Sequence, residues 1–476
     1  MAGRSETKPN ILLLACDTLG AAHMGCYGYH RDTCPHIGRL ADRGVLFENV
    51  YPSDVPTEPS YTAMLSGQRG ITTGVVTHDD AETIPFRTPW LPSILSDGYT
   101  TCAVTTLNQM KKDLTRGFCH VVDPAYRPNR KRDPTAGKRG MRRADAFEIN
   151  ELVISWLRSL SGERFFLFVH YWDPHTPYLP PDEYKYRWYD GDPADPSHHF
   201  LEETKKHLDS KYPPTVAQRL SVSAKMRMSA GSVGVNTNDI EWVVAQHDAE
   251  ISYLDDQIAK LLEAFEEMGL VDKTLIILTG DHGECIYEHD CFSDHGNVYE
   301  PTIRVPLIMV LPETLPRRKK IESFVQQIDI LPTVMDLLNM RKPQATDGES
   351  LLPLVNGDTE KIHDCIICSQ GLWQASRAIR IGDWKFIDIL ERGFWGPDSA
   401  YELYDLGKDP DEENNLIETE PEMAERLQIR LDRWVHEHVA KRQDRIDPLR
   451  TALRRPTSPL ASYNVQRIPH GYHPSE

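Results

Sequence analysis

The sequence lacks the features that would place the chain in a membrane or mark it for secretion. No run approaches the ~18 apolar residues that a membrane span needs, and the first residues, MAGRSETKPN, contain no apolar core of a signal peptide. Net positive charge is also missing, because 71 acidic residues outnumber 53 basic ones and give a net charge of −18. That balance argues against nucleic-acid or anionic-membrane partners. We therefore expect a cytoplasmic protein.

Cysteine is sparse and unpatterned. The nine cysteines are scattered, mostly inside apolar runs, which fits reduced, buried thiols better than a disulfide framework. The one CxxC pair, Cys365 and Cys368, lies in the apolar run CIIC, and no second pair completes a zinc site. We therefore interpret it as part of a core strand. The length of 476 residues allows one large α/β domain and a smaller one.

Two apolar stretches each end in candidate metal ligands. Residues 274–284, TLIILTGDHGE, begin with an apolar run without alternation, which predicts a strand buried on both faces of a parallel sheet. Asp281 and His282 follow it. Residues 11–15 predict a second such strand, followed by Asp17. Because ligands bind at the carboxyl ends of such strands, we predict that these side chains share a metal ion. The alternative is a turn that Asp caps beside an incidental His.

Further polar candidates follow other predicted strands. Residues 165–170 form a buried strand that ends in HYWDPHTPY, where two prolines should hold His175 in extended backbone. His175 is a site candidate, with a purely structural histidine as the alternative. The loop after LTGDHGE carries His289 and His295, and we select His295. Asn108 falls past the end of another predicted strand.

Thr57 is the candidate nucleophile. The segment PSDVPTEPSYTAMLSG predicts a loop followed by a helix that starts near Pro59 and Ser60, because proline suits a first helical turn. Thr57 would then stand just before the helix N-terminus, where free N–H groups and the helix dipole favour an alkoxide. A simple N-cap role is the other interpretation, and both can hold.

The remaining segments predict a two-part α/β fold, with a large, mostly parallel sheet sandwiched by helices and a smaller C-terminal α+β subdomain with an antiparallel sheet. A long polar insertion should be a lid, an interface element or disordered, and a basic stretch should be an exposed loop. The predicted parts are a catalytic domain (1–360, with the insertion at 182–238 and the basic loop at 121–143), the subdomain (361–444) and a C-terminal arm (445–476). Further helices are predicted over residues 144–160, 239–268, 324–338 and 421–438.

Eight ordered blocks resemble the sulfatase branch of the alkaline phosphatase superfamily from about Lys8 to about His438: PNILLLACDTLG, PHIGRLADRGVLFENVY, TEPSYTAMLSG, HYWDPHTPY, EISYLDDQIAKLLEAFEEMGL, LTGDHGE, RVPLIM and ELYDLGKDPDEENNL. The resemblance implies an alkaline phosphatase-like fold. It also implies roles for individual residues: metal ligands (Asp17, Asp281, His282 and Thr57), the nucleophile (Thr57), groups that hold the anionic oxygens or protonate the leaving group (His175, His295) and further substrate contacts (Asn108, Tyr61).

The nucleophile motif departs from that of sulfatases proper. In the family, Cys or Ser within CxPSR is oxidised to formylglycine, whose hydrate can expel sulfate. Here the segment is TEPSY, residues 57–61. Thr is a secondary alcohol and can give at most a ketone, so a sulfated Thr57 lacks that exit. A phosphorylated Thr can instead be cleared by in-line attack of water on phosphorus. We therefore favour phosphate diesters or phosphonate monoesters, as in phosphonate monoester hydrolases and phosphodiesterases.

The metal site departs from the family as well. Many sulfatases have a second acid after the first Asp, but Thr18 stands there in this chain, and His282 adds a nitrogen. Fewer oxygens and an imidazole favour Mn²⁺ or Zn²⁺, with Ca²⁺ as an alternative. The DxxxH spacing of two-zinc phosphatases occurs only where no buried strand precedes it. We therefore expect one metal ion.

Several functional interpretations remain open from the sequence. The favoured one is a hydrolase that acts on a small anionic ester. The alternatives are a sulfatase that lacks formylglycine, a phosphoglycerol- or phosphoethanolamine-type transferase, and a binding protein that kept the fold. The C-terminal arm predicts a homo-oligomer.

Overall fold

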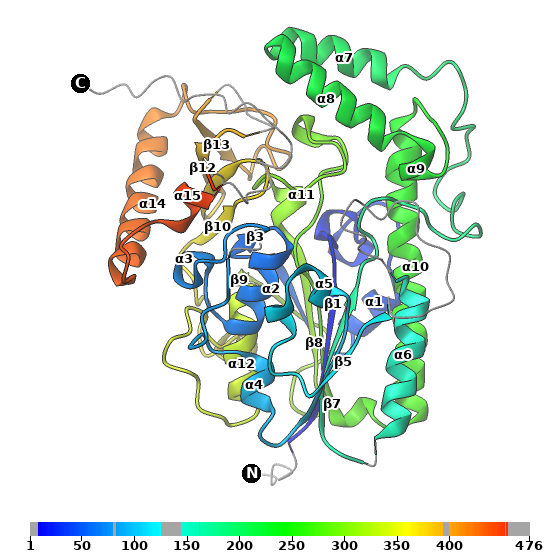
Figure 1. Cartoon of the computed structure of the whole chain (residues 1–476), viewed down its shortest axis with the longest axis vertical. Helices are drawn as coiled ribbons and strands as arrows, with labels where there is room; N and C mark the ends of the chain where they lie inside the picture. The colour runs from blue at the N-terminus through cyan, green and yellow to red at the C-terminus, as the bar shows by residue number, and fades with distance from the viewer. Residues whose placement is uncertain are drawn as a thin grey trace.

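The computed structural model describes residues 8–79, 82–124, 144–160, 162–393, 399–452 and 454–455. These residues form a large sheet flanked by helices and a small second sheet near the C-terminus (Figure 1). Most of the predicted basic loop, from residue 125 to 143, and the end of the predicted arm lie outside the described residues. None of the described helices has the length and apolar character needed to cross a membrane.

The large sheet has the strand order β5-β4-β6-β1-β7-β8-β2-β9. Strand β1 pairs in parallel with β6 and β7, whereas β8 runs antiparallel to β7 and β2. The prediction of a large, mostly parallel sheet is therefore confirmed. Its strands are β1 (Asn10–Cys16), β2 (Val45–Tyr51), β4 (Thr100–Val104), β5 (His120–Val122), β6 (Phe165–Tyr171), β7 (Thr274–Gly280), β8 (Val305–Val310) and β9 (Lys319–Gln326).

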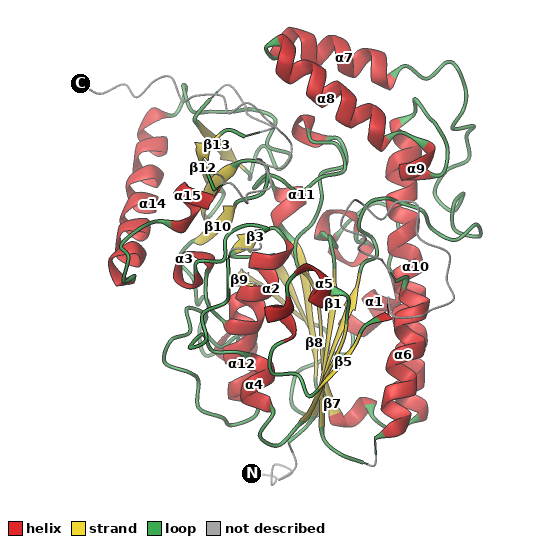
Figure 2. Cartoon of the chain, viewed as in Figure 1, coloured by secondary structure: helices red, strands yellow, loops and turns green. Residues whose placement is uncertain are grey.

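Helices cover both faces of this sheet, which explains why its central strands are apolar throughout (Figure 2). Alternate residues of β1 point into two different cores: Ile11 and Leu13 into one, Leu12 and Leu14 into the other. The first core is covered by α2 (Thr57–Ser66), α4 (Leu91–Leu95) and α12 (Ile330–Leu337). The second is covered by α1 (Pro35–Ala41), α6 (Ala146–Ser159) and α10 (Ile240–Glu267).

The predicted helix over residues 324–338 starts too early. Its first residues belong to β9, which pairs with β2 at the edge of the sheet. Gln326 and Asp329 then form a reciprocal capping box, in which each side chain binds the other residue's backbone N–H. Because this capping box satisfies the first free N–H groups, the chain turns helical only after β9 has ended.

The polar insertion is ordered and largely helical. It contains α7 (Phe200–Lys211), α8 (Pro214–Arg227) and α9 (Ala230–Val233). Helices α7 and α8 form a hairpin beyond the carboxyl ends of the strands (Figure 1). Leu208 and Leu220 of the hairpin pack against Cys291 and Phe292 in the loop after β7, so apolar contacts fix its position.

The small sheet has the order β13-β12-β11-β10-β3, and β10 to β13 are antiparallel as predicted. Its strands are β3 (Asp54–Val55), β10 (Ile366–Gln370), β11 (Ala375–Ile381), β12 (Trp384–Glu391) and β13 (Tyr401–Asp405), and α14 (Pro421–Lys441) packs on it. Cys368 is buried within β10, as predicted for a core strand, whereas Cys365 comes directly before the strand and is half-buried. The unexpected member is β3, which pairs in parallel with β10.

The start of the predicted arm folds back on its own chain. A short helix, α15 (Pro448–Ala452), follows Asp447, which forms a buried ion pair with Arg377 at 2.9 Å.

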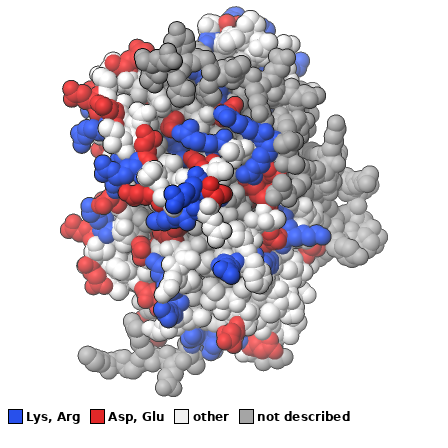
Figure 3. All heavy atoms as spheres, turned by 60° about the vertical axis from the view of Figure 1, so that its left-hand side comes forward, with Lys and Arg blue, Asp and Glu red and all other residues white. Residues whose placement is uncertain are grey.

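On the face brought forward from the left of Figure 1, basic and acidic side chains are interspersed (Figure 3). The homo-oligomer and the cytoplasmic location stay predictions.

Candidate active site

The carboxyl ends of β1 and β7 bring Asp17 and Asp281 together. Cys16 and Gly280 are partners in the parallel pairing, so the next residue on each strand is an aspartate. Ligand atoms of Asp17, Asp281 and His282 all lie within 4.8 Å of one another, and all three side chains are fully buried. The structure thus brings together the three residues that the sequence predicts as metal ligands.

The donor set fits a divalent cation. Asp281 Oδ1 accepts from the backbone N–H groups of Thr18 (3.0 Å) and His282 (2.8 Å), whereas Oδ2 is buried and accepts no hydrogen bond among the described residues. Burial and then Asp17 raise the pKa of Asp281 well above its ordinary value. Burial keeps the pKa of His282 well below its ordinary value, so the ring is neutral. Two carboxylates and a neutral imidazole at one buried point make a cation site.

Thr57 faces this cluster. Its Oγ1 lies 3.2 Å from His282 Nε2, and only 2% of the residue is exposed. Thr57 is the first residue of α2 rather than the residue before the helix, and Pro56 is the N-cap. The N-cap interpretation of Thr57 is therefore wrong. Ser60 Oγ ties α2 to the end of β7 by donating to the Asp281 carbonyl oxygen at 2.7 Å.

His295 and His175 lie on the other side of His282. The His295 ring stacks on His282 with centroids 4.2 Å apart, and it meets His175 edge-on at 5.6 Å. The backbone N–H of His175 donates to the Trp172 carbonyl at 2.8 Å. His175 therefore sits in a hydrogen-bonded turn, not in the extended backbone expected from its prolines.

Glu284 is a site residue that the sequence analysis missed. Its Oε1 lies 3.6 Å from His295 Nδ1, and Tyr178 donates to its other oxygen. Burial alone would raise the pKa of Glu284, but its interaction with His295 and the charge of His175 lower it well below its ordinary range. In turn, burial is outweighed by Glu284 and Asp294, and the pKa of His295 is raised. The signal was its place in the DHGE block, three residues after Asp281.

His170 was also missed. It is the penultimate residue of β6 and the register partner of Ala15. It is fully buried, with Nε2 3.4 Å from Asp17 Oδ2. Burial lowers its pKa to about 3. The sequence signal was an imidazole at the end of a buried strand, but the proline-flanked His175 five residues later drew the assignment.

Two predicted substrate contacts do not touch the metal-ligand cluster directly among the described residues. Tyr61 is fully buried under the site, with its ring against Phe168 and His170 at centroid distances of 5.9 and 5.3 Å. Its contact with a substrate stays a prediction. Asn108 lies in the short helix α5 (Leu107–Met110) and donates to Asp123 at 3.0 Å. The structure shows no bond from it to the metal-ligand cluster among the described residues.

His289, the candidate that was not selected, has a structural role. Its ring stacks on Tyr299 with centroids 3.7 Å apart. Burial, and secondarily Lys385, lower its pKa to about 4. This burial predicts a measurable acid sensitivity.

We expect His289→Gln to remove part of the acid destabilisation of the protein. The folded pKa of about 4 lies below the unfolded value of about 6.5, so the unfolded state binds more protons between these values. The contribution of His289 is complete above about pH 6.5 and is lost as the pH falls toward 4, by at most roughly 3 kcal/mol. Urea unfolding at both ends of this range measures it. A wild-type-minus-variant difference that is equal at both ends would contradict the prediction.

The fold and the buried site of acids and imidazoles are those of a metal-dependent hydrolase. Comparison with known proteins identifies its family. A family model described as Sulfatase matches residues 9–340, and a model described as N-sulphoglucosamine sulphohydrolase, C-terminal, matches residues 287–441. The chain belongs to the sulfatase family, within the alkaline phosphatase-like superfamily. Family enzymes depend on a metal, in keeping with the cluster described above.

The curated relatives are sulfatases of low identity. The chain is 26% identical over 433 residues to a Delta 4,5-hexuronate-2-O-sulfatase from Bacteroides thetaiotaomicron, a match that covers 87% of this chain and 86% of that protein. It is 24% identical over 461 residues to Arylsulfatase K from Gallus gallus, covering 89% and 82%.

Solved structures of two kinds share the fold. One is a 2-O GAG sulfatase, with a TM-score of 0.70, 23% identity, and coverage of 91% of this chain and 93% of that chain. The other is the phosphonate monoester hydrolase of Agrobacterium radiobacter, with a TM-score of 0.68, 19% identity, and coverage of 94% and 97%. At this identity the likeness establishes the fold alone.

Proposed function

We propose that the chain hydrolyses a small anionic ester, with Thr57 as the nucleophile beside a divalent cation held by Asp17, Asp281 and His282. The observation that carries this proposal is the position of Thr57 Oγ1, 3.2 Å from His282 Nε2 within the buried cluster. Membership of the sulfatase family supports the reaction class.

Sulfate esters are the first candidate substrate. The chemistry of an unmodified threonine led the sequence analysis to favour phosphate diesters or phosphonate monoesters. The curated relatives support the sulfatase alternative better, because they are named as sulfatases and match most of this chain. The phosphonate monoester hydrolases match as structures only. A Thr57-dependent sulfatase would have to hydrolyse its sulfated threonine by direct attack of water on sulfur.

Phosphonate monoesters and phosphate diesters are the second candidate. The specific observation is Thr57 itself, whose secondary hydroxyl cannot give the formylglycine aldehyde. A phosphorylated Thr57 can be cleared by water, so this chemistry needs no modified residue.

Each residue then has a distinct role. A divalent cation, for which the mixed oxygen and nitrogen donors favour Mn²⁺ or Zn²⁺, supplies charge stabilisation to the reacting oxygens when bound. Thr57 Oγ1 loses its proton to water and attacks the phosphorus or sulfur atom, and the bond from that atom to the leaving alcohol breaks. Water then hydrolyses the ester formed on Thr57 and restores its hydroxyl. The N-terminal turn of α2 and His175 hold the non-bridging oxygens. His295, whose pKa Glu284 and Asp294 raise, protonates the departing alcohol.

A four-substrate assay tests the proposal. The metal-loaded protein is given an aryl sulfate, an aryl phosphate monoester, an aryl phosphate diester and an aryl phosphonate monoester, and kcat/KM is compared. We expect the sulfate to be turned over fastest and the Thr57→Ala variant to be inactive on it. A fastest rate on the diester or phosphonate would select the second candidate. Absence of Thr57-dependent turnover on all four would overturn the hydrolase proposal.

A further inference from the structure

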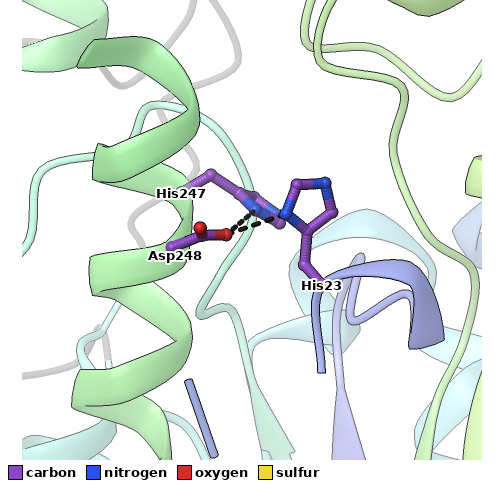
Figure 4. A group of neighbouring side chains, drawn as sticks. All are labelled: His23, His247 and Asp248. Atoms are coloured by element: carbon purple, nitrogen blue, oxygen red, sulfur yellow. Dashed lines mark hydrogen bonds and ion pairs between the residues drawn. The ribbon is translucent and has the colours of Figure 1, made fainter. Parts of the chain in front are cut away.

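Outside the candidate active site, a second group of metal-ligating side chains gathers where the segment after β1 meets α10. His23 lies in a short 3-10 helix (Ala21–His23), and His247 and Asp248 are consecutive residues of α10 (Figure 4). One ligand atom from each of the three lies within 4.8 Å of the others. No role in the proposed ester hydrolysis uses these residues.

Asp248 is arranged as an oriented carboxylate. Its Oδ2 accepts from the Tyr29 hydroxyl at 2.9 Å and from Arg31 Nη1 at 2.8 Å. Its Oδ1 faces the two imidazoles, with His23 Nδ1 at 2.8 Å and His247 Nδ1 at 3.6 Å. Hydrogen bonds on one oxygen that leave the other directed at imidazole nitrogens are typical of a metal-binding carboxylate.

His247 supplies an independent observation that points to a ligand. Its side chain is 3% exposed, and its Nδ1 is a buried atom without a hydrogen-bond partner among the described residues. The Asp248 oxygen, at 3.6 Å, is too far to make one. A buried nitrogen without a hydrogen bond costs free energy unless something fills its coordination position.

We propose that His23 Nδ1, His247 Nδ1 and Asp248 Oδ1 form a second metal site, selective for Zn²⁺ or a similar nitrogen-preferring divalent cation. Two imidazoles and one carboxylate are a zinc donor set with a fourth position open to water. Ligand atoms of a tetrahedral zinc site lie about 3.3 Å apart, given bonds of about 2.0–2.1 Å. The two separations from Asp248 Oδ1, 2.8 Å to His23 and 3.6 Å to His247, bracket this value. One ligand atom of each of the three residues lies within 4.8 Å of the others.

The position of the site gives it a structural consequence. The His247 ring meets Tyr178 edge-on at 5.1 Å, and Tyr178 donates to Glu284, which faces His295. His23 follows the same strand that delivers Asp17. A cation here would tie α10 to the segment after β1, and three successive contacts connect His247 to the proposed general acid, His295. His23 retains 14% side-chain exposure, which leaves an entry path.

Zinc stoichiometry tests the site without reference to turnover. Chelator-treated full-length protein is titrated with Zn²⁺, passed through a desalting column and analysed by mass spectrometry for metal per chain. The variants are His23→Ala and His247→Gln in the second site and Asp17→Asn in the first. His30→Ala is the matched control, because His30 is an exposed neighbour outside the cluster, whose ring meets Tyr29 edge-on with centroids 4.3 Å apart.

We expect the wild type and His30→Ala to retain one equivalent of zinc more than His23→Ala or His247→Gln. Asp17→Asn should retain the equivalent of the second site, and Co²⁺ in that variant should give the visible absorption of a four-coordinate ion. Equal zinc in His23→Ala and wild type, or no zinc in Asp17→Asn, would overturn the proposal. If the buried His247→Gln fails to fold by circular dichroism, the partly exposed His23→Ala decides.

Discussion

Thr57→Ala is expected to lower kcat/KM by at least about a thousandfold, on the scale of losses seen when a catalytic nucleophile is removed. The hydroxyl lies 3.2 Å from His282 Nε2 and is the group that would attack the ester. Three ligands to the proposed cation would remain, so the metal content should stay near the wild-type value. Steady-state kinetics on the best of the four test substrates, together with metal analysis of the same sample, measures both parts.

The matched control is Thr62→Ala in the same helix. Thr62 is equally buried, but its hydroxyl donates to the Glu58 carbonyl of its own helix at 2.7 Å and does not reach the cluster. This variant should keep most of the activity. Thr57→Ser should also keep part of it, because a hydroxyl remains at the same position. Full activity of Thr57→Ala would show that another group attacks the substrate.

Asp281→Asn is expected to weaken binding of the first metal ion by at least about a hundredfold. Even the loss of a residue that only hydrogen-bonds to a metal ligand lowers metal affinity by about 10–100-fold. Turnover should fall with it. The amide is nearly isosteric, and its oxygen can still accept from Thr18 and His282. Burial, and then repulsion by Asp17, raise the pKa of Asp281. The neutral amide removes both costs of holding a carboxylate there. The metal-free variant should therefore melt at a higher temperature than the metal-free wild type.

Metal titration followed by calorimetry and thermal melts with and without chelator measure these effects. Asp54→Asn is the control, because Asp54 is another buried aspartate, whose carboxylate accepts from Gly70 N at 2.8 Å outside the cluster. It should leave metal affinity unchanged. Unaltered affinity in Asp281→Asn would refute the assignment of the ligand.

The central strands and the acids at their ends were predictable because their signals are local. A fully apolar run such as residues 274–280 has one favoured interpretation, a strand covered on both faces, and the parallel register then fixes where Asp17 and Asp281 meet. The edge strand β9 was not predictable in this way. Its burial is irregular, and only pairing with β2 distinguishes it from the start of a helix.

Other features depend on contacts that the sequence does not show. Pro59 suggested where α2 starts, but the helix begins two residues earlier, at Thr57. The first N–H groups of a helix have no partner within it, so a proline fits the third position as well as the first. Pro59 therefore could not fix the exact start. Glu284 and His170 gain their significance only from what faces them. His23 and Asp248 are separated by 225 positions in the chain, and only the packing of α10 brings them together.

The two-residue strand β3 connects the C-terminal subdomain to the segment that carries the proposed nucleophile. Asp54 and Val55 pair with Ser369 and Gln370 of β10, and Thr57 follows only two residues later. The small sheet therefore anchors the backbone just before Thr57 and so helps to position its hydroxyl relative to the large sheet. Excising residues 361–444 would leave every proposed metal ligand of the first site in the remaining polypeptide. It would, however, remove β10, the strand that pairs with β3 next to Thr57.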